Sequence, residues 1–136
     1  MNSISELVFM LNSILKVFSR NISLQALEES LAHNRRAVIH GMGGSSASFL
    51  AVYLAGKIFA EPDRSILAVL PDEEEAESFR DDVEGIIGAS GVRYFPERDT
   101  SPYEHADSHV EVRSQRVETL DSLERGWRGV VIAAAG

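Results

Sequence analysis

The chain has 136 residues, enough for one domain with a substantial apolar core. Acids outnumber bases by 21 to 13, and the net charge is −8. This balance disfavours nucleic-acid binding by the chain alone, because phosphate contacts need a clustered basic surface. The absence of cysteine excludes disulfides, thiolate metal sites and cysteine nucleophiles. No basic residue precedes Lys16, and polar residues interrupt the apolar N-terminus. We therefore predict neither a signal peptide nor a membrane span, and expect a cytoplasmic location.

Residues 1–35 are predicted to form a helical segment. One amphipathic stripe has apolar residues at three- and four-residue steps: Ile4, Leu7, Val8, Leu11, Leu15 and Phe18. Leu24, Leu27 and Leu31 begin a second, shorter helix after a break at residues 21–23. The polar faces of these helices are not rich in Lys or Arg. Packing against the rest of the domain is therefore favoured over membrane binding.

Residues 36–136 are predicted to alternate strands with helices. Short apolar runs indicate strands at residues 37–40, 65–70, 92–95 and 129–133. A helix is expected at about residues 46–59. Its apolar side consists of Leu50, Tyr53, Leu54 and Ile58. Strands that are continuous apolar runs are typical of a parallel sheet covered by helices on both faces, so the predicted fold class is α/β.

Two further helices are predicted from capping signals. Asp72 and Glu75 form a cap-like pair at the start of one helix, and its acids suit the positive end of the helix dipole. The buried stripe of this helix is Ala76, Phe79, Val83 and Ile86. Ser108 and Glu111 form a capping box for the other helix. This last helix carries Val110, Val117, Leu120 and Leu123.

A phosphate-loop frame extends from Gly41 to Ser48. In a loop of the G-x-x-x-x-G-K-[ST] type, backbone N–H groups cradle the phosphates, the lysine neutralises their charge and the last hydroxyl holds Mg²⁺. Here Ser46 replaces the second glycine, Ala47 replaces the lysine and Ser48 keeps the hydroxyl. The frame consists of Gly41, Met42, Gly43, Gly44, Ser45, Ser46, Ala47 and Ser48. A place between a strand and a helix suits anions, but the missing lysine favours a structural relic over nucleotide hydrolysis. Weak anion binding by the backbone stays open.

Other catalytic and metal motifs are weak. His105 and His109 have an i, i+4 spacing, but this spacing aligns side chains only in a helix, and Pro102 favours a loop there. The acidic run at residues 72–75 is explained by the start of a helix. The nucleophile-elbow pattern G-x-S-x-G is absent, which disfavours a serine hydrolase. We therefore predict no catalytic residue and no metal site.

The last feature is a long polar loop, expected from Pro96 to His109. Long loops in compact domains are often functional. The most distinctive residues at this loop are Phe95, Pro96, Asp99, Thr100, Ser101, Pro102, Tyr103 and Glu104. This stretch resembles the N-terminal, UvrB-like region of bacterial transcription-repair coupling factors, the Mfd family.

The order of the other segments agrees with this resemblance. Residues 41–48 resemble the degenerate phosphate loop of the family, and the strand ending at residues 70–72 and the acidic helix at 74–79 follow in the same order. A helix containing residues 114–116 and the strand at 129–132 complete the match. The resemblance covers roughly residues 37–134. It implies a RecA-like parallel α/β domain (UvrB-like domain 1A) over residues 36–136, preceded by the helical segment 1–35.

The resemblance also implies a part in a larger machine. Coupling factors are ATP-dependent DNA translocases that displace RNA polymerase stalled at DNA damage and recruit UvrA for nucleotide excision repair. Their motor, which binds ATP, Mg²⁺ and duplex DNA, lies outside the region that this chain resembles. The segment is therefore expected to be a non-catalytic scaffold without a cofactor of its own. It is expected to support the UvrA-binding domain and to pack against other domains of the same chain. Because the chain ends directly after its last strand, we expect it to be a fragment of a longer protein.

Two alternatives stay open. An unorthodox P-loop NTPase or nucleotide sensor would need a basic residue from elsewhere and an acid after an apolar strand, whereas the run at 130–132 continues into alanines. A UvrB-type damage-recognition subunit shares the frame, but it keeps the loop lysine and carries a hairpin that grips DNA. Ala47, and the lack of an aromatic-rich insertion between Phe95 and His109, favour the coupling factor.

Overall fold

The computed structural model describes Ser13, Lys16 and residues 22–58, 64–97 and 106–135. The chain separates into two compact units, residues 1–44 and residues 45–136. In the first unit, helix α2 (Ile22–Asn34) confirms the second predicted helix, but it begins at Ile22, inside the break predicted at residues 21–23. Ser13 and Lys16 are helical, and the other residues of the first predicted helix lie outside the described part of the chain.

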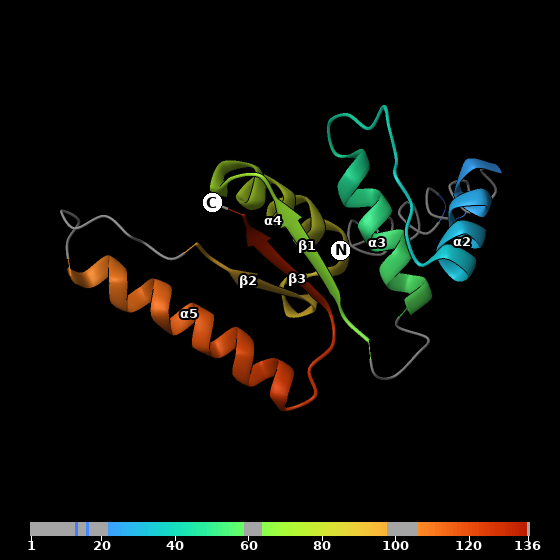
Figure 1. Ribbon diagram of the computed structural model, residues 1–136. Helices are drawn as coiled ribbons and strands as arrows, with labels where there is room; N and C mark the ends of the chain where they lie inside the picture. Colours follow the sequence, from blue (N-terminus) through green and yellow to red (C-terminus); the bar gives the residue numbers. More distant parts are fainter. Residues whose placement is uncertain (1–12, 14–15, 17–21, 59–63, 98–105, 136) are drawn as a thin grey trace, which may run out of the picture. The chain divides into compact units, whose positions relative to one another are not determined.

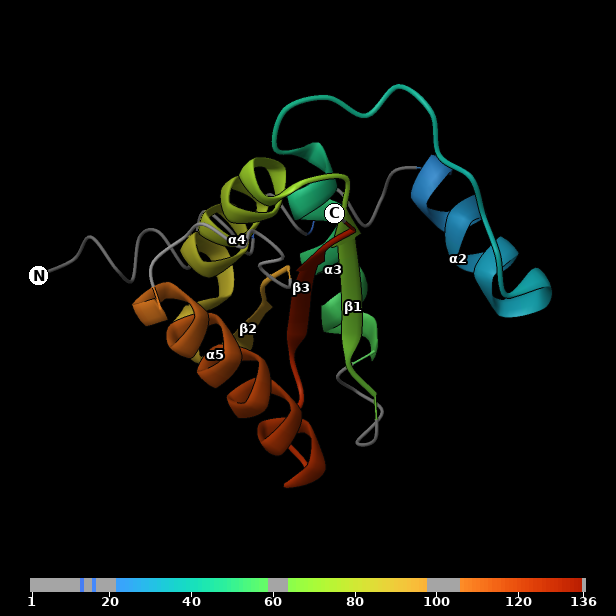
Figure 2. The same ribbon diagram turned by 60° about the vertical axis from the view of Figure 1, so that its left-hand side comes forward.

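The second unit contains a parallel sheet of three described strands. They are β1 (Ile66–Leu70), β2 (Val92–Phe95) and β3 (Val130–Ala134), and their order is β1-β3-β2. β3 lies between the other two, as Figures 1 and 2 show, and pairs with both in parallel. The structure thus confirms the α/β class and three of the four predicted strands.

The strand predicted at residues 37–40 is wrong. This segment has no strand structure, and the exposed fractions of Val38 and Ile39 are 70% and 43%. It belongs to the first unit, whereas the sheet belongs to the second. An apolar run becomes a strand only when a neighbouring strand pairs with it, and a local pattern does not specify that partner.

Helices α3 (Ser46–Ile58) and α4 (Glu73–Ile87) cover one face of the sheet. Asp72 caps α4 as predicted, because its side chain accepts a hydrogen bond of 2.9 Å from the backbone N–H of Glu75. The core between α4 and the sheet includes side chains predicted from the helical stripe, together with side chains of β3. Its buried members include Ala76, Phe79, Val83, Val130 and Ile132.

Helix α5 (Ala106–Glu124) lies on the opposite face and packs on β2 (Figure 1). The opposite placement follows from handedness: β1 connects to β2 across the sheet in one direction, and β2 connects back to β3 in the other. Right-handed crossovers therefore put α4 and α5 on opposite faces. The helix begins before Ser108, so the capping box predicted at Ser108 is not its N-terminus, and the loop predicted to reach His109 ends earlier.

The predicted apolar residues of α5 are only partly covered. Leu123 is half-buried, and Val110, Val117 and Leu120 are exposed, whereas the polar Thr119 is buried. The prediction that helices cover both faces of the sheet is therefore confirmed for one face and holds only over β2 on the other.

Candidate functional site

The first half of the phosphate-loop frame is an irregular and exposed segment. Gly41 and Gly44 adopt positive φ angles of 79° and 55°, which only glycine adopts readily. At Gly41, Gly43 and Gly44, no described atom comes within 4 Å of the place where a Cβ would be. Backbone conformation therefore explains Gly41 and Gly44, whereas neither a positive φ angle nor a close contact explains Gly43.

The second half of the frame begins helix α3 in the other compact unit. The division between the units falls at Gly44–Ser45, inside the frame. The carbonyl of Ser45 accepts a hydrogen bond of 3.1 Å from the N–H of Phe49, which closes the first turn of the helix. Ser46 and Ala47 are half-buried at the start of α3. A helix N-terminus is thus present, whereas the strand that should precede the loop is not formed among the described residues.

Ser48 is the residue that should keep the magnesium-binding hydroxyl. It is only 2% exposed, and its hydroxyl donates a hydrogen bond of 3.1 Å to Oδ2 of Asp82 on α4. Asp82 is half-buried at this helix contact. The hydroxyl therefore joins α3 to α4 and is directed into the protein. In this arrangement it acts as a structural donor between two helices.

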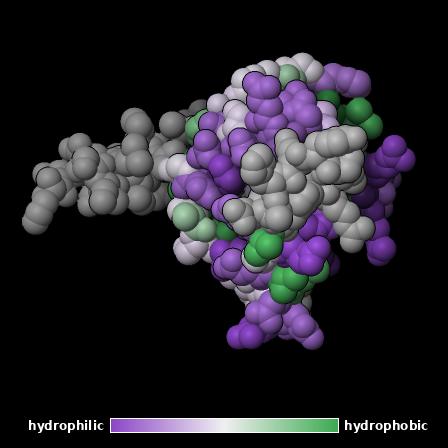
Figure 3. Space-filling view, turned by 90° about the vertical axis from the view of Figure 1, so that its left-hand side faces the viewer, coloured by the Kyte–Doolittle hydropathy of each residue, from purple (hydrophilic) through white to green (hydrophobic). Residues whose placement is uncertain are grey.

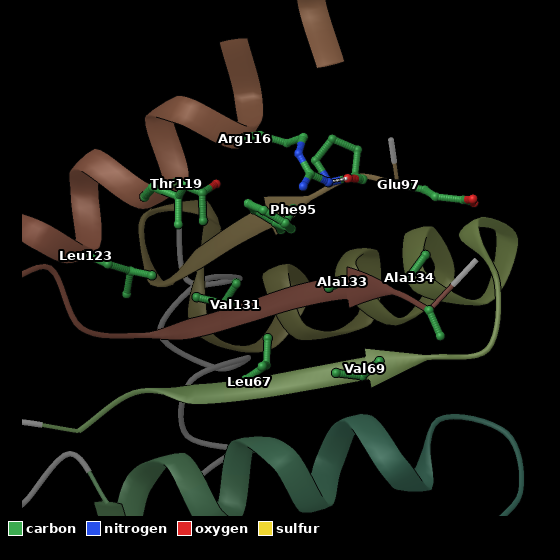
Figure 4. Close-up of a pocket in the computed structure, with 13 residues that line it drawn as sticks. Leu67, Val69, Phe95, Glu97, Arg116, Thr119, Leu123, Val131, Ala133 and Ala134 are labelled. Carbon is green, nitrogen blue, oxygen red and sulfur yellow. Dashed lines mark hydrogen bonds between the residues drawn. The ribbon is translucent and has the colours of Figure 1, made fainter. Parts of the chain in front are cut away.

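The family-signature loop is described only at its start. Phe95 ends β2, and Pro96 is fully buried directly after it. Nη1 of Arg116 donates a hydrogen bond of 2.7 Å to the carbonyl of Pro96, and the Arg116 guanidinium lies 4.0 Å from the centre of the Phe95 ring. Figure 4 shows this bond and the position of Arg116 above Phe95. Asp99, Thr100, Ser101, Pro102, Tyr103 and Glu104 lie outside the described residues.

This contact links two segments that are 20 residues apart in the sequence. Phe95–Pro96 belongs to the signature stretch, and Arg116 belongs to the helix segment 114–116 that also carries the resemblance. Stacking and a charge-assisted hydrogen bond fix the entry to the loop against α5. Sequence reasoning identified both segments but not their contact, because no local pattern specifies a partner on another element.

A cluster of polar side chains lies on the side of the sheet that α4 covers. The Tyr94 hydroxyl donates a hydrogen bond of 3.0 Å to Oε1 of Glu73, and the Arg80 guanidinium lies 5.1 Å from the ring centre. Burial and the bond to Glu73 raise the pKa of Tyr94 above its usual value, so the tyrosine stays neutral in the folded protein. This cluster joins β2 to α4.

At the other end of β2, Trp127 connects the segment before β3 to the short 3-10 helix η1 (Ala89–Gly91), which directly precedes β2. Its indole N–H donates to the carbonyl of Ser90 at 3.0 Å, and the Arg93 guanidinium lies 4.7 Å from the ring centre. Arg93 also donates to the hydroxyl of Ser122 on α5 at 3.3 Å. These contacts were not predicted, and they hold α5 to the sheet through polar groups.

The sequence predicts no metal site at His105 and His109, because both are expected to lie in a loop. His109 lies in α5, contrary to the expected loop, and His105 lies outside the described residues. Within the described ranges no group of three or more His, Asp or Glu side chains is arranged to hold a metal ion. None of the described helices is both long and apolar enough to cross a membrane.

Comparisons of the chain with protein-family models, with curated proteins and with solved structures found no match.

Proposed function

We propose that the chain is a non-catalytic scaffold segment from the N-terminal region of a transcription-repair coupling factor. In this proposal its α/β unit is a RecA-like domain that has lost nucleotide chemistry. The full-length protein would use an ATP- and Mg²⁺-dependent motor elsewhere to move on duplex DNA, displace stalled RNA polymerase and recruit UvrA. This segment would support the UvrA-binding domain and pack against other domains of its own chain.

The observation that carries the non-catalytic part of the proposal is the state of Ser48. A phosphate loop needs its lysine to neutralise phosphate charge and its hydroxyl to hold Mg²⁺. Ala47 supplies no charge, and the Ser48 hydroxyl is buried and bonded to Asp82. A carboxylate beside that hydroxyl also disfavours a phosphate at the same place, since like charges repel. Two requirements of nucleotide hydrolysis are therefore unmet.

The coupling-factor part of the proposal is supported by the resemblance of residues 37–134 and by one contact. Arg116 binds the Pro96 carbonyl and stacks on Phe95, which joins two of the resembling segments. The excess of acids agrees with a segment that leaves DNA binding to other domains.

Calorimetric titration with Mg²⁺–ATP tests the non-catalytic role. We expect no saturable heat from the parent chain. Ala47→Lys is the matched variant, because it restores the loop charge while leaving Ser48 bonded to Asp82. We expect this variant to bind Mg²⁺–ATP little or no better than the parent chain, because the Ser48 hydroxyl stays bonded to Asp82. Micromolar binding or ATP turnover by the parent would overturn the scaffold role and favour the nucleotide-sensor alternative.

Strand-specific repair tests the coupling role. We expect deletion of the gene for this chain in its own bacterium to abolish the faster repair of transcribed strands after ultraviolet damage. General excision repair should continue, because it does not depend on a coupling factor. Unchanged preference for the transcribed strand would contradict the coupling role even if the chain binds no nucleotide.

A further inference from the structure

A groove between α5 and β1 is lined by three of the large apolar side chains that are exposed among the described residues of the second unit. These residues are Leu67 and Val69 on β1 and Leu120 on α5. The groove has a volume of about 540 Å³, and its floor includes Val131 and Ala133 of β3. Figure 4 shows β1 on one side of the opening and α5 on the other. Exposed apolar surface gathered in this way marks an interaction site more often than isolated exposed residues do.

The dimensions of the groove fit one helix. β1 and β2 flank β3, and neighbouring strands lie about 4.8 Å apart, so β1 and β2 are separated by roughly 9.6 Å. Packed helices have axes about 8–10 Å apart, and α5 already occupies the place over β2. The uncovered place over β1 is therefore about one helix wide. It lies beside a helix of 19 residues, which is about 28 Å long.

The charge of the second unit indicates what kind of helix fits. Residues 45–136 contain 18 Asp and Glu but only 9 Lys and Arg. The groove lining itself contains one exposed carboxylate, Glu97, and one guanidinium, Arg116, which is bonded to Pro96 and stacked on Phe95, so the excess of acids belongs to the unit as a whole. Figure 3 shows that most of the coloured surface on one side of the molecule is hydrophilic, with a few apolar side chains among the hydrophilic ones. The excess of acids in the composition gives the unit a negative charge, which attracts a basic partner and repels a second copy of the same chain.

We propose that the groove between α5 and β1 is a docking site for a basic amphipathic helix of a partner. The apolar stripe of that helix covers Leu67, Val69 and Leu120, and its Lys and Arg residues are attracted by the net negative charge of the second unit. This is recognition of a helix in a groove, with anchors at i, i+3, i+4 and i+7. The inference does not depend on the coupling-factor role, because it uses only the uncovered face and its charge.

The test uses the full chain and two fluorescent probe peptides of 18 residues. Both peptides carry leucines at i, i+3, i+4 and i+7, and the remaining positions are lysine in one and glutamate in the other. Fluorescence anisotropy is expected to show saturable binding of the lysine peptide and much weaker binding of the glutamate peptide. Leu67→Ser combined with Val69→Ser should weaken binding roughly tenfold or more, since buried aliphatic contacts are lost. Both side chains are mostly exposed in the free protein, so these changes should leave the fold intact.

Val38→Ser is the matched control, because Val38 is exposed but belongs to the other unit. It should leave peptide binding unchanged. The proposal is overturned by absence of saturable binding, by equal binding of the two peptides, or by binding that the Leu67 and Val69 changes do not weaken. Sedimentation of the peptide-free chain adds one more outcome: dimers that these two changes dissociate would identify a second copy as the occupant and overturn the basic-helix proposal.

Discussion

The two faces of the sheet are stabilised in different ways. On the face covered by α3 and α4, side chains such as Val83 and Ile132 are completely buried. On the face covered by α5, the helix is joined to β2 by polar contacts, including the Thr119 hydroxyl on the Tyr94 carbonyl at 2.9 Å. Several apolar side chains there, such as Leu67 at 65% exposure, face solvent.

This difference separates stability from recognition. Burial of an aliphatic side chain contributes about 1.5–3 kcal/mol, whereas a typical hydrogen bond contributes about 1 kcal/mol net. The first face should therefore supply most of the folding free energy. The second face positions α5 through hydrogen bonds and leaves its apolar surface available for a partner. Substitutions on the first face should therefore have large effects on the free energy of unfolding, whereas substitutions on the second face should affect it less and should mainly change partner binding.

The largest contrast is expected between Ile132→Ala and Leu67→Ala. Both remove a similar amount of side chain from neighbouring strands of the same sheet. Ile132→Ala should lower the free energy of unfolding by about 2–5 kcal/mol, because it leaves a cavity in the closed core. Leu67→Ala should change it by less than about 0.5 kcal/mol, because Leu67 is mostly exposed. Urea unfolding followed by circular dichroism measures both, and equal losses would remove the distinction between the faces.

A smaller effect is expected from Ser48→Ala on the closed face. The change removes the donor to Asp82 and leaves a half-buried carboxylate without this bond. Hydrogen bonds to charged groups contribute about 1.5–3 kcal/mol, so we expect a loss of about 1–2 kcal/mol. Ser78→Ala is the control, because Ser78 is exposed on α4. If Ser48→Ala matches that control, the hydroxyl does not join the two helices, and Ser48 has no structural role at this contact.

The sequence predicted those features that depend on neighbouring residues. The cap at Asp72 was predicted correctly because its partner, Glu75, is three residues away, and the stripe of Ala76, Phe79 and Val83 because the helical repeat itself places these residues on one side. Ser48 and Asp82 are 34 residues apart, and no local pattern indicates that they meet. The strand at residues 37–40 failed for the same reason, since pairing depends on a distant segment.

The exposed stripe of α5 shows a second limit of the sequence. Periodicity shows that Val117 and Leu120 lie on one side of a helix, but not whether another element covers that side. Whether an apolar side chain is covered depends on how many helices lie on that face of the sheet. The number of helices on each face follows from the order of the strands, which the sequence alone does not give. The same limit applies to the candidate site. The sequence shows the glycine-rich frame, but it does not show that the Ser48 hydroxyl is hydrogen-bonded to Asp82.

On the open face, Thr119→Val should have a moderate effect of about 1 kcal/mol. Valine keeps the shape of the buried side chain but cannot donate to the Tyr94 carbonyl. Thr119→Ser is the matched control, because it keeps the hydroxyl and loses only a methyl group. Hydrogen exchange of α5 amides should rise in the valine variant more than in the serine variant. Equal exchange in the two variants would show that this bond does not hold α5.

The smallest effect concerns pH and the polar cluster on the closed face. Burial and the hydrogen bond to Glu73 raise the pKa of Tyr94, with further contributions from the charge of Glu73 and from Glu77, while Arg80 acts in the opposite direction. The folded state therefore favours the neutral tyrosine. Its contribution is fully present below the ordinary tyrosine pKa of about 10 and is lost as pH rises above that value.

Tyr94→Phe isolates this contribution, because it removes the titrating hydroxyl and keeps the ring under Arg80. Near neutral pH the variant should be slightly less stable, since an exposed hydrogen bond is lost. Between about pH 9 and pH 11 the parent should lose more stability than the variant, so the difference between their urea midpoints should shrink. Parallel decreases over this interval would show that Tyr94 does not couple β2 to α4 through its proton. The contrast between the faces would then depend on apolar burial and on the Ser48 bond alone.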